Sequence, residues 1–201
     1  LILALEGSGP PEALEVLEKA SVPMVLVPEG FDRDGILAKI EAVGRALGVE
    51  ERASELAAQV EADTLAAERL TANINQPAKV IFVLSLQSGR ILASGTGTAA
   101  DGVMSMAGAQ NAVSGYAGYK QMSDEAVIEA APDFVLAMDR GGDHETAADE
   151  LLAHPAIAAT PAGRAGRVIR MDGSFLLGFG PRTASAVRDL ARALYGEAVT
   201  D

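Results

Sequence analysis

Apolar positions follow two periodicities along the chain. Short apolar runs of strand length occur at 1–5, 23–27, 79–85, 133–138 and 167–171. Segments with apolar residues at helical spacing, or with helix-forming composition, lie between and after these runs, at 12–20, 36–47, 50–75, 99–108, 124–131 and 183–195. Strands that alternate with helices predict parallel sheets covered by helices, which is the α/β class.

The stretch from Asp32 to Asn75 contains no proline and is predicted to be helical nearly throughout. Asp32 is a candidate N-cap of a first helix, which Gly48 is predicted to end. Residues 50–75 are rich in alanine, glutamate, leucine and arginine, and a helix of that length spans about 35–40 Å. Its apolar stripe is narrow and alanine-rich, which favours a long helix that connects two lobes over a helix at the centre of a bundle.

We therefore predict two Rossmann-like α/β lobes with parallel sheets, joined by a single long helix. Residues 1–48 form the C-terminal part of the first lobe, 49–77 the bridging helix, and 78–201 a complete second lobe. The first lobe is incomplete, because the run at 1–5 is typical of a buried strand and follows neither an initiating methionine nor a signal segment. We expect the chain to begin inside a larger protein.

Charge and composition narrow the classes of partner. The formal net charge is −12, which argues against nucleic acid or an anionic membrane surface, because both require a basic face. No run of about 18 apolar residues is present, so no segment is predicted to insert into a membrane. The chain has no cysteine, which excludes disulfides, thiolate metal sites and cysteine nucleophiles within it.

The run Gly95-Thr96-Gly97-Thr98-Ala99-Ala100 matches the dinucleotide pattern G-x-G-x-x-A. In a dinucleotide-binding fold the first glycine directly follows a strand, whereas nine residues separate Ser85 from Gly95 here. No acidic residue ends a second strand about twenty positions later. A nucleotide-dependent enzyme on a Rossmann-type lobe is therefore disfavoured but kept as an alternative.

The two histidines are weak candidates for chemistry. His144 lies in the acidic loop 139–145, where a cation site is one interpretation. A solvated loop leading into a helix, with Asp143 as a candidate cap, is the commoner case. His154 precedes a proline and is expected at the surface. No G-x-S-x-G turn is present, so the sequence predicts no enzyme but a ligand cleft lined by glycine- and hydroxyl-rich loops.

Several motifs resemble the periplasmic haem-binding proteins of bacterial haem ABC importers, in order and spacing over nearly the whole chain. They lie at 6–11, 87–90, 95–101, 107–112, 118–123, 131–133 and 176–183. The Gly-Thr-Gly-Thr-Ala-Ala-Asp run at 95–101 and the Gly-Phe-Gly-Pro-Arg run at 178–182 favour haem. Asn111 and the Gly-Tyr-Lys loop at 118–120 are shared with the broader group that binds siderophores and cobalamin.

The resemblance implies that the protein captures haem in the periplasm and delivers it to the permease of an ABC transporter. Haem is then the transported ligand, and no catalytic cofactor is expected. The resemblance also implies a signal segment upstream, and we expect a monomer. The alternative within the class is a siderophore or cobalamin as ligand. In this family an axial tyrosine on the iron comes from an early part of the first lobe, which precedes Leu1, and neither Tyr116 nor Tyr119 aligns with it.

Haem contacts are expected from the loops after the second-lobe strands, because ligands of parallel α/β sheets bind beyond the carboxyl ends of the strands. The predicted ligand-binding residues are Gln87, Ser88, Arg90, Tyr116, Tyr119, Phe175, Leu176 and Arg182. Apolar residues should cover the haem face, and an arginine should pair with a propionate, with Arg182 preferred over Arg90. The alternative for Arg182 is a cap on the closing helix or a partner for a backbone carbonyl. Neither histidine is expected to ligate iron.

Glu12 and Glu125 are the predicted contacts with the permease. Each lies at the start of a helix that follows a ligand-side loop, one in each lobe. The two positions resemble the docking glutamates of the related cobalamin-binding proteins, although Glu12 is offset by one residue and Asp124 is able to substitute for Glu125. The alternative is that both carboxylates only favour their helix dipoles.

Overall fold

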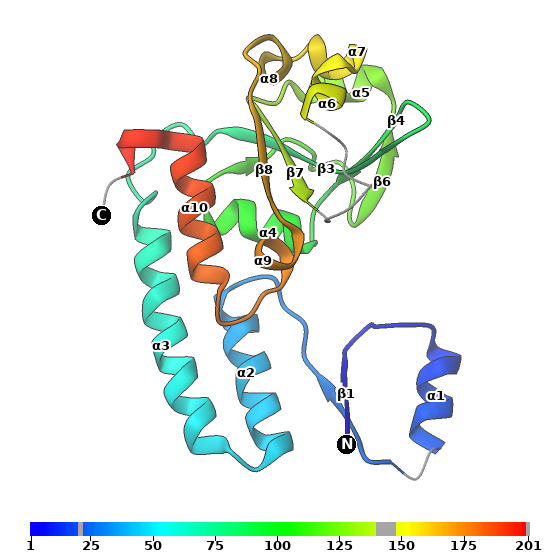
Figure 1. Cartoon of the computed structure of the whole chain (residues 1–201), viewed down its shortest axis with the longest axis vertical. Coiled ribbons are helices and arrows are strands. Elements are labelled where there is room, and N and C mark those ends of the chain that lie inside the picture. Colours follow the sequence, from blue (N-terminus) through cyan, green and yellow to red (C-terminus); the bar gives the residue numbers. More distant parts are fainter. Residues whose placement is uncertain (20–21, 140–147, 200–201) are drawn as a thin grey trace.

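The chain forms a small two-stranded fragment and a larger α/β body (Figure 1). This computed structural model describes residues 1–19, 22–139 and 148–199. We call residues 1–27 the first-lobe fragment and residues 33–199 the body. The chain passes from one to the other once, through the segment 28–32 (Figure 1).

The first-lobe fragment is a β-α-β unit, as predicted. Strand β1 (Ile2–Leu5) pairs in parallel with β2 (Met24–Val27), and α1 (Pro11–Lys19) lies between them in sequence. Leu3 and Leu26 remain 40% and 44% exposed. They lie on opposite faces of the sheet because Leu3 is in register with Val25, the neighbour of Leu26. Neither face of this small sheet is therefore fully covered.

Two antiparallel helices follow. Helix α2 (Arg33–Leu47) is capped by Asp32, whose carboxylate accepts a 2.7 Å hydrogen bond from the Gly35 N–H, and ends at Gly48 in the left-handed conformation. Both caps confirm the prediction. Helix α3 (Glu50–Arg69) ends six residues before the predicted Asn75. Hydrogen-bonded turns replace it where weak helix formers such as Asn73 and Asn75 begin.

Helix α3 is not an isolated strut, because it packs between α2 and α10 (Thr183–Tyr195) (Figure 1). Its buried positions are mostly small, among them Ala53, Ala57 and Ala67, which accounts for the narrow stripe in the sequence. One hydrophobic core runs from Ile36 of α2 through α3 to the central sheet. The boundary at residue 48 is not marked by a break in this core, and the division into 1–48, 49–77 and 78–201 stays a prediction.

The sheet of the second lobe is mixed rather than wholly parallel. Its strands are β3 (Lys79–Gln87), β4 (Arg90–Ser94), β5 (Gln110–Asn111), β6 (Tyr119–Met122), β7 (Phe134–Asp139) and β8 (Val168–Asp172). The order is β6-β4-β3-β7-β8, with β5 also on β3. Strands β5 and β7 run parallel to β3, and β8 runs parallel to β7, whereas β4 is antiparallel to both of its neighbours, β3 and β6. The α/β class is confirmed.

Strands β4 and β6 were not predicted from the sequence. They lie in the stretches 86–98 and 111–123, neither of which was among the predicted strands. Strand β3 continues into a tight hairpin whose turn residues, Ser88 and Gly89, have φ values of 52° and 71°. Positive φ at both central positions matches the right-handed twist of a hairpin, and Gly89 adopts it without a side-chain clash.

Helices cover both faces of this sheet. Along β3, Val80 and Phe82 point to the core that contains α4 (Ala99–Met106), α9 (Gly173–Leu177) and α10. Ile81 and Val83 point to a second core on the other face. The helices of that face are α5 (Asp124–Ala130), α6 (Ala148–Ala153), α7 (Pro155–Ala158) and α8 (Pro161–Arg164). Within the described residues, no helix is both long and apolar enough to cross a membrane.

The contact between α2 and α3 predicts the effect of a single added methyl group. A Cβ on Gly44 would overlap the Cβ of Ala53, so Gly44→Ala should force the helices apart and lower the free energy of unfolding by about 2 kcal/mol. Alanine in place of helical glycine would otherwise be favourable by about 1 kcal/mol. Urea unfolding measures the difference.

The control for this prediction is the double variant Gly44→Ala/Ala53→Gly, which moves the methyl group across the interface. It should recover much of the loss, giving a coupling energy above about 1 kcal/mol. Effects that simply add would show that the two positions do not limit the approach of the helices.

Candidate ligand-binding site

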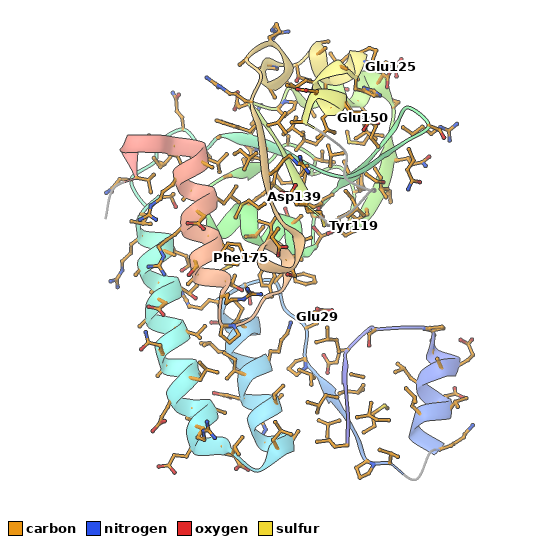
Figure 2. The ribbon with its side chains drawn as sticks, viewed as in Figure 1. Glu29, Tyr119, Glu125, Asp139, Glu150 and Phe175 are labelled. Carbon is orange, nitrogen blue, oxygen red and sulfur yellow. The ribbon has the colours of Figure 1, made fainter. Side chains whose placement is uncertain are left out.

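The candidate site is the side of the second lobe that is nearer to the first-lobe fragment. Figure 2 shows Tyr119, Asp139 and Phe175 on that side, with Glu29 of the connecting segment below them, whereas Glu125 and Glu150 lie on the opposite side. The carboxyl ends of β7 and β8 meet there, joined by an ion pair between Asp139 and Arg170. This is the edge at which ligands of parallel sheets bind.

Tyr119 is the tyrosine that faces outward at this edge. It begins β6, and its side chain is 37% exposed. Its ring packs edge-on against Phe82, with centroids 6.4 Å apart. Burial raises the pKa of the hydroxyl, partly offset by hydrogen bonds with the Thr98 side chain and the Ala100 backbone. The hydroxyl is therefore protonated at neutral pH.

Phe175 of α9 lies beside Arg182, the residue that precedes α10. The Arg182 guanidinium stands 5.8 Å from the centroid of the Phe175 ring. Asp172 caps α9 by accepting from the Phe175 N–H at 2.8 Å and from the Ser174 hydroxyl at 2.7 Å. The hydrogen bond from Ser174, then that from Phe175, and the nearby Arg182 lower the pKa of Asp172. An aromatic ring beside a cation can hold a flat ligand with an anionic end.

Arg182 precedes α10, but its side chain makes no capping hydrogen bond to that helix. The alternative role as a helix cap is therefore not supported, and the guanidinium stays exposed at the edge of the site.

Two of the predicted residues do not face the site. Leu176 is 0% exposed and belongs to the core, because the helical turn of α9 directs Leu176 inward and leaves Phe175 outside. This geometry gives no support to a direct ligand contact for Leu176, which stays a prediction. The Tyr116 hydroxyl donates to the carbonyl oxygens of Ala93, at 3.1 Å, and Lys120, at 3.4 Å. Tyr116 thus holds the loop before β6 against β4.

Gln87, Ser88 and Arg90 lie at the tip of the β3–β4 hairpin and are exposed. The tip projects away from α9, at the outer edge of the sheet (Figure 1). Arg90 donates to the Gln121 side chain at 3.3 Å. The structure does not bring these three residues together with Phe175 and Arg182, because β3 continues past the parallel part of the sheet.

His154 was expected at the surface, but it is buried, with 8% of its surface exposed. Its Nδ1 accepts from the Ala156 N–H at 3.3 Å, and its Nε2 lies 3.1 Å from the Gly89 carbonyl oxygen. Nε2 therefore donates, and the ring ties the start of α7 to the hairpin tip. His144 and the rest of the acidic loop beyond Asp139 lie outside the described residues.

No group of three or more histidine, aspartate or glutamate side chains that could hold a metal ion occurs within the described parts of the chain.

The glycine-rich run does not form a phosphate cradle. Thr98 caps α4 by accepting from the Asp101 N–H at 3.1 Å, and the Asp101 carboxylate accepts from the Gly97 N–H at 2.9 Å. These backbone donors are already satisfied, and a carboxylate at the helix start repels phosphate. The geometry gives no support to the nucleotide-dependent enzyme.

Asn111 has a structural role that the sequence reasoning missed. Its Nδ2 donates to Asp101 Oδ1 at 2.9 Å and to the Gly95 carbonyl oxygen at 3.2 Å, and its Oδ1 accepts from the Val113 N–H at 2.9 Å. One side chain thus joins β5 to the loop that leads into α4. Because Tyr119 hydrogen bonds to the same loop, Asn111 helps to set its position.

Both predicted docking glutamates lie in first helical turns. Glu12 is exposed in α1, and Glu125 is exposed in α5. Hydrogen bonds from its own backbone N–H and from the Ser123 side chain lower the pKa of Glu125. This geometry suits a favourable interaction with the helix dipole and leaves the carboxylate accessible, so both interpretations stay open.

Comparisons with known proteins agree with this architecture. A family model described as periplasmic binding protein matches residues 1–174. The structure is similar to that of the periplasmic heme-binding protein BhuT in complex with two hemes, with 40% identity and a TM-score of 0.89 over 98% of this chain and 75% of BhuT. It is also similar to the heme-binding protein RhuT from Roseiflexus sp. RS-1, with 38% identity and a TM-score of 0.89 over 98% of this chain and 76% of RhuT.

A curated relative is the ABC transporter substrate-binding lipoprotein YvrC of Bacillus subtilis strain 168, described as uncharacterized. It is 25% identical over 198 residues, which are 97% of this chain. The chain spans 62% of the length of this relative.

The network around Asn111 predicts a large effect of removing one amide. Asn111→Ala removes the donor to Asp101 Oδ1, one of the donors to the Gly95 carbonyl oxygen, and the acceptor of the Val113 N–H, so the free energy of unfolding should fall by about 2 kcal/mol in urea unfolding. The control is Gln110→Ala at the exposed neighbouring position, which should cost less than about 0.5 kcal/mol. Similar losses in both variants would contradict the role given to Asn111.

Proposed function

The chain belongs to the periplasmic binding protein family, and we propose that it captures haem in the periplasm and delivers it to the permease of an ABC transporter. The observation that carries the proposal is the 40% identity, over 98% of the chain, to a protein described as a periplasmic heme-binding protein and solved with two hemes. RhuT, at 38% identity, is described in the same way.

The chemistry of the candidate site supports haem as the cargo. Haem is a flat apolar ring with two propionates at one edge. Phe175 offers an aromatic face, Arg182 offers a guanidinium for a propionate, and Tyr119 adds a hydroxyl at the same side of the lobe. We propose these three residues as the second-lobe wall, whereas Leu176 lies in the core.

We assign no iron ligand to this chain. Burial raises the pKa of Tyr119, which makes the phenolate that binds ferric iron harder to form. His154 has protein partners at both ring nitrogens. By the family resemblance, the axial tyrosine comes from a part of the first lobe that precedes Leu1.

The rest of the proposal follows from the transport role. YvrC is described as a substrate-binding lipoprotein and BhuT as a periplasmic heme-binding protein, and we propose that this protein is a periplasmic monomer without catalytic activity. The family also includes proteins with other ligands, so a siderophore or cobalamin is the alternative cargo. The experiments below include both as competitors.

Haemin titration of the full-length protein tests the cargo. We expect a Soret shift that saturates at stoichiometric haemin and is not displaced by excess ferric siderophore or cyanocobalamin. Displacement by either competitor, with no haemin spectrum remaining, would identify the alternative cargo. Absence of binding for all three would overturn the proposed function.

The same titration distinguishes the two candidate arginines. Arg182→Ala should weaken haem binding about tenfold, because a charge-assisted hydrogen bond to a propionate is lost. Arg90→Ala is the matched control, since Arg90 lies at the hairpin tip beside Gln121, and should leave affinity unchanged. An equal loss in both variants would contradict the placement of the propionate at Arg182.

The docking role of Glu12 and Glu125 predicts a selective loss of transport. In vesicles reconstituted with the permease, Glu12→Ala/Glu125→Ala should slow haem uptake at low protein concentration while haem binding survives. The loss should diminish at high salt, because exposed ion pairs mainly steer the encounter.

The matched control is Glu15→Ala/Glu129→Ala, which removes exposed glutamates from the same two helices, α1 and α5. Uptake equal to wild type for the first pair, or the same loss for both pairs, would refute specific docking at Glu12 and Glu125.

A further inference from the structure

The connection between the first-lobe fragment and the body is short and closely held. Val27 ends β2, and Arg33 begins α2. Between them the chain rises beside α9 and the segment that leads into α10 (Figure 1). The orientation of the first-lobe fragment therefore depends on how the body holds residues 28–32.

Phe31 is the side chain by which the body holds this connection. Its ring packs edge-on against Phe179, with centroids 5.3 Å apart and planes at 72°. Its backbone lies against α4, where a Cβ on Gly102 would overlap the Phe31 carbonyl oxygen and press on its Cβ. We call Phe31, Gly102 and Phe179 the aromatic joint.

Phe179 is placed in the joint by an unusual backbone. It has a φ of 40°, which is rare for a residue with a bulky side chain, and its side chain is 1% exposed. The preceding Gly178 cannot accept a side chain, because a Cβ there would lie against the Ser174 carbonyl oxygen. The Gly-Phe-Gly run thus aims a ring into the body, where it meets Phe31.

Further contacts hold the two ends of the connection. Gly30 and Gly35 approach so closely that a Cβ on either would overlap the other. Glu29 pairs with Lys39 of α2 at 3.8 Å, and Arg33 pairs with Glu68 of α3 at 2.9 Å. These contacts fix the connection to α2 and α3, and the aromatic joint fixes it to α4 and the segment before α10.

We propose that the aromatic joint is a second attachment between the lobes, which sets the angle between the two walls of the ligand site independently of α3. Phe31 is the positioning residue, since it acts through the orientation of the first lobe and not by touching the ligand. The consequence for haem rests on the proposed function, whereas the consequence for the lobe angle does not.

Distances between spin labels test the joint directly in the full-length protein. Residues 1–201 contain no cysteine, so once any cysteine outside this range is replaced, labels can be attached through Glu15→Cys on α1 and Glu129→Cys on α5, both exposed sites. Phe31→Ala should broaden the distribution of distances between the labels. Gly102→Ala should do the same by pushing the Phe31 backbone away, and it tests the joint without removing an aromatic ring.

The matched control is Phe134→Ala, which removes a ring from the body at the start of β7, where Phe134 contacts Arg167. It should lower stability without changing the distances. Phe31→Leu should restore part of the narrow distribution. Unchanged distances in Phe31→Ala or in Gly102→Ala, or equal broadening in Phe134→Ala, would overturn the proposal.

Haem affinity supplies the second readout. If the binding-competent angle falls to about a tenth of the population in Phe31→Ala, the apparent Kd for haemin rises about tenfold. Phe134→Ala should keep the wild-type Kd. A wild-type protein that binds no haemin would refute the proposed function alone, because the label distances still decide the joint.

Discussion

The close packing of α3 against α2 and α10 is the constraint on which the rest of the structure depends. Gly44 and Ala53 allow the two helix backbones to approach, and Ala57 and Ala67 continue the same thin face along α3. Larger side chains would separate α2 from the sheet and divide the core. Because the core stays continuous, α2 and the connection that precedes it are held by the body.

Different elements form the two walls of the proposed ligand site. The second-lobe wall is built on the ends of β6 and β8 and on α9, and is supported from within by Asn111 and Tyr116. The first-lobe fragment contributes an open two-stranded sheet, and its angle to the second lobe is proposed to be set at Phe31. In this proposal the residues that contact the ligand and the residue that orients the lobes are different sets.

Much of the fold followed from the sequence, because strong local signals agreed with the tertiary structure. Asp32 and Gly48 bounded α2, and 183–195 was predicted as a helix with the bounds that α10 has. Strand β4 was missed because a five-residue strand carries little periodicity, although Ser88-Gly89 between apolar runs is a hairpin signal. Leu176 was expected at the ligand and His154 at the surface, but both side chains are buried. Burial depends on tertiary packing, which the residues adjacent in sequence do not determine.

Strand β3 has consequences for the order in which the second lobe assembles. Its last residues pair with β4 across a two-residue turn, whereas its first half pairs with β7, more than fifty positions later in the chain. Closing the short loop costs far less entropy than closing the long one. The register shift between Val83 and Ser85 lies within the β3–β4 pairing, and Val83 pairs with both β4 and β7. The hairpin can thus form as a local nucleus during synthesis, and its inner half then serves as the template on which β7 docks.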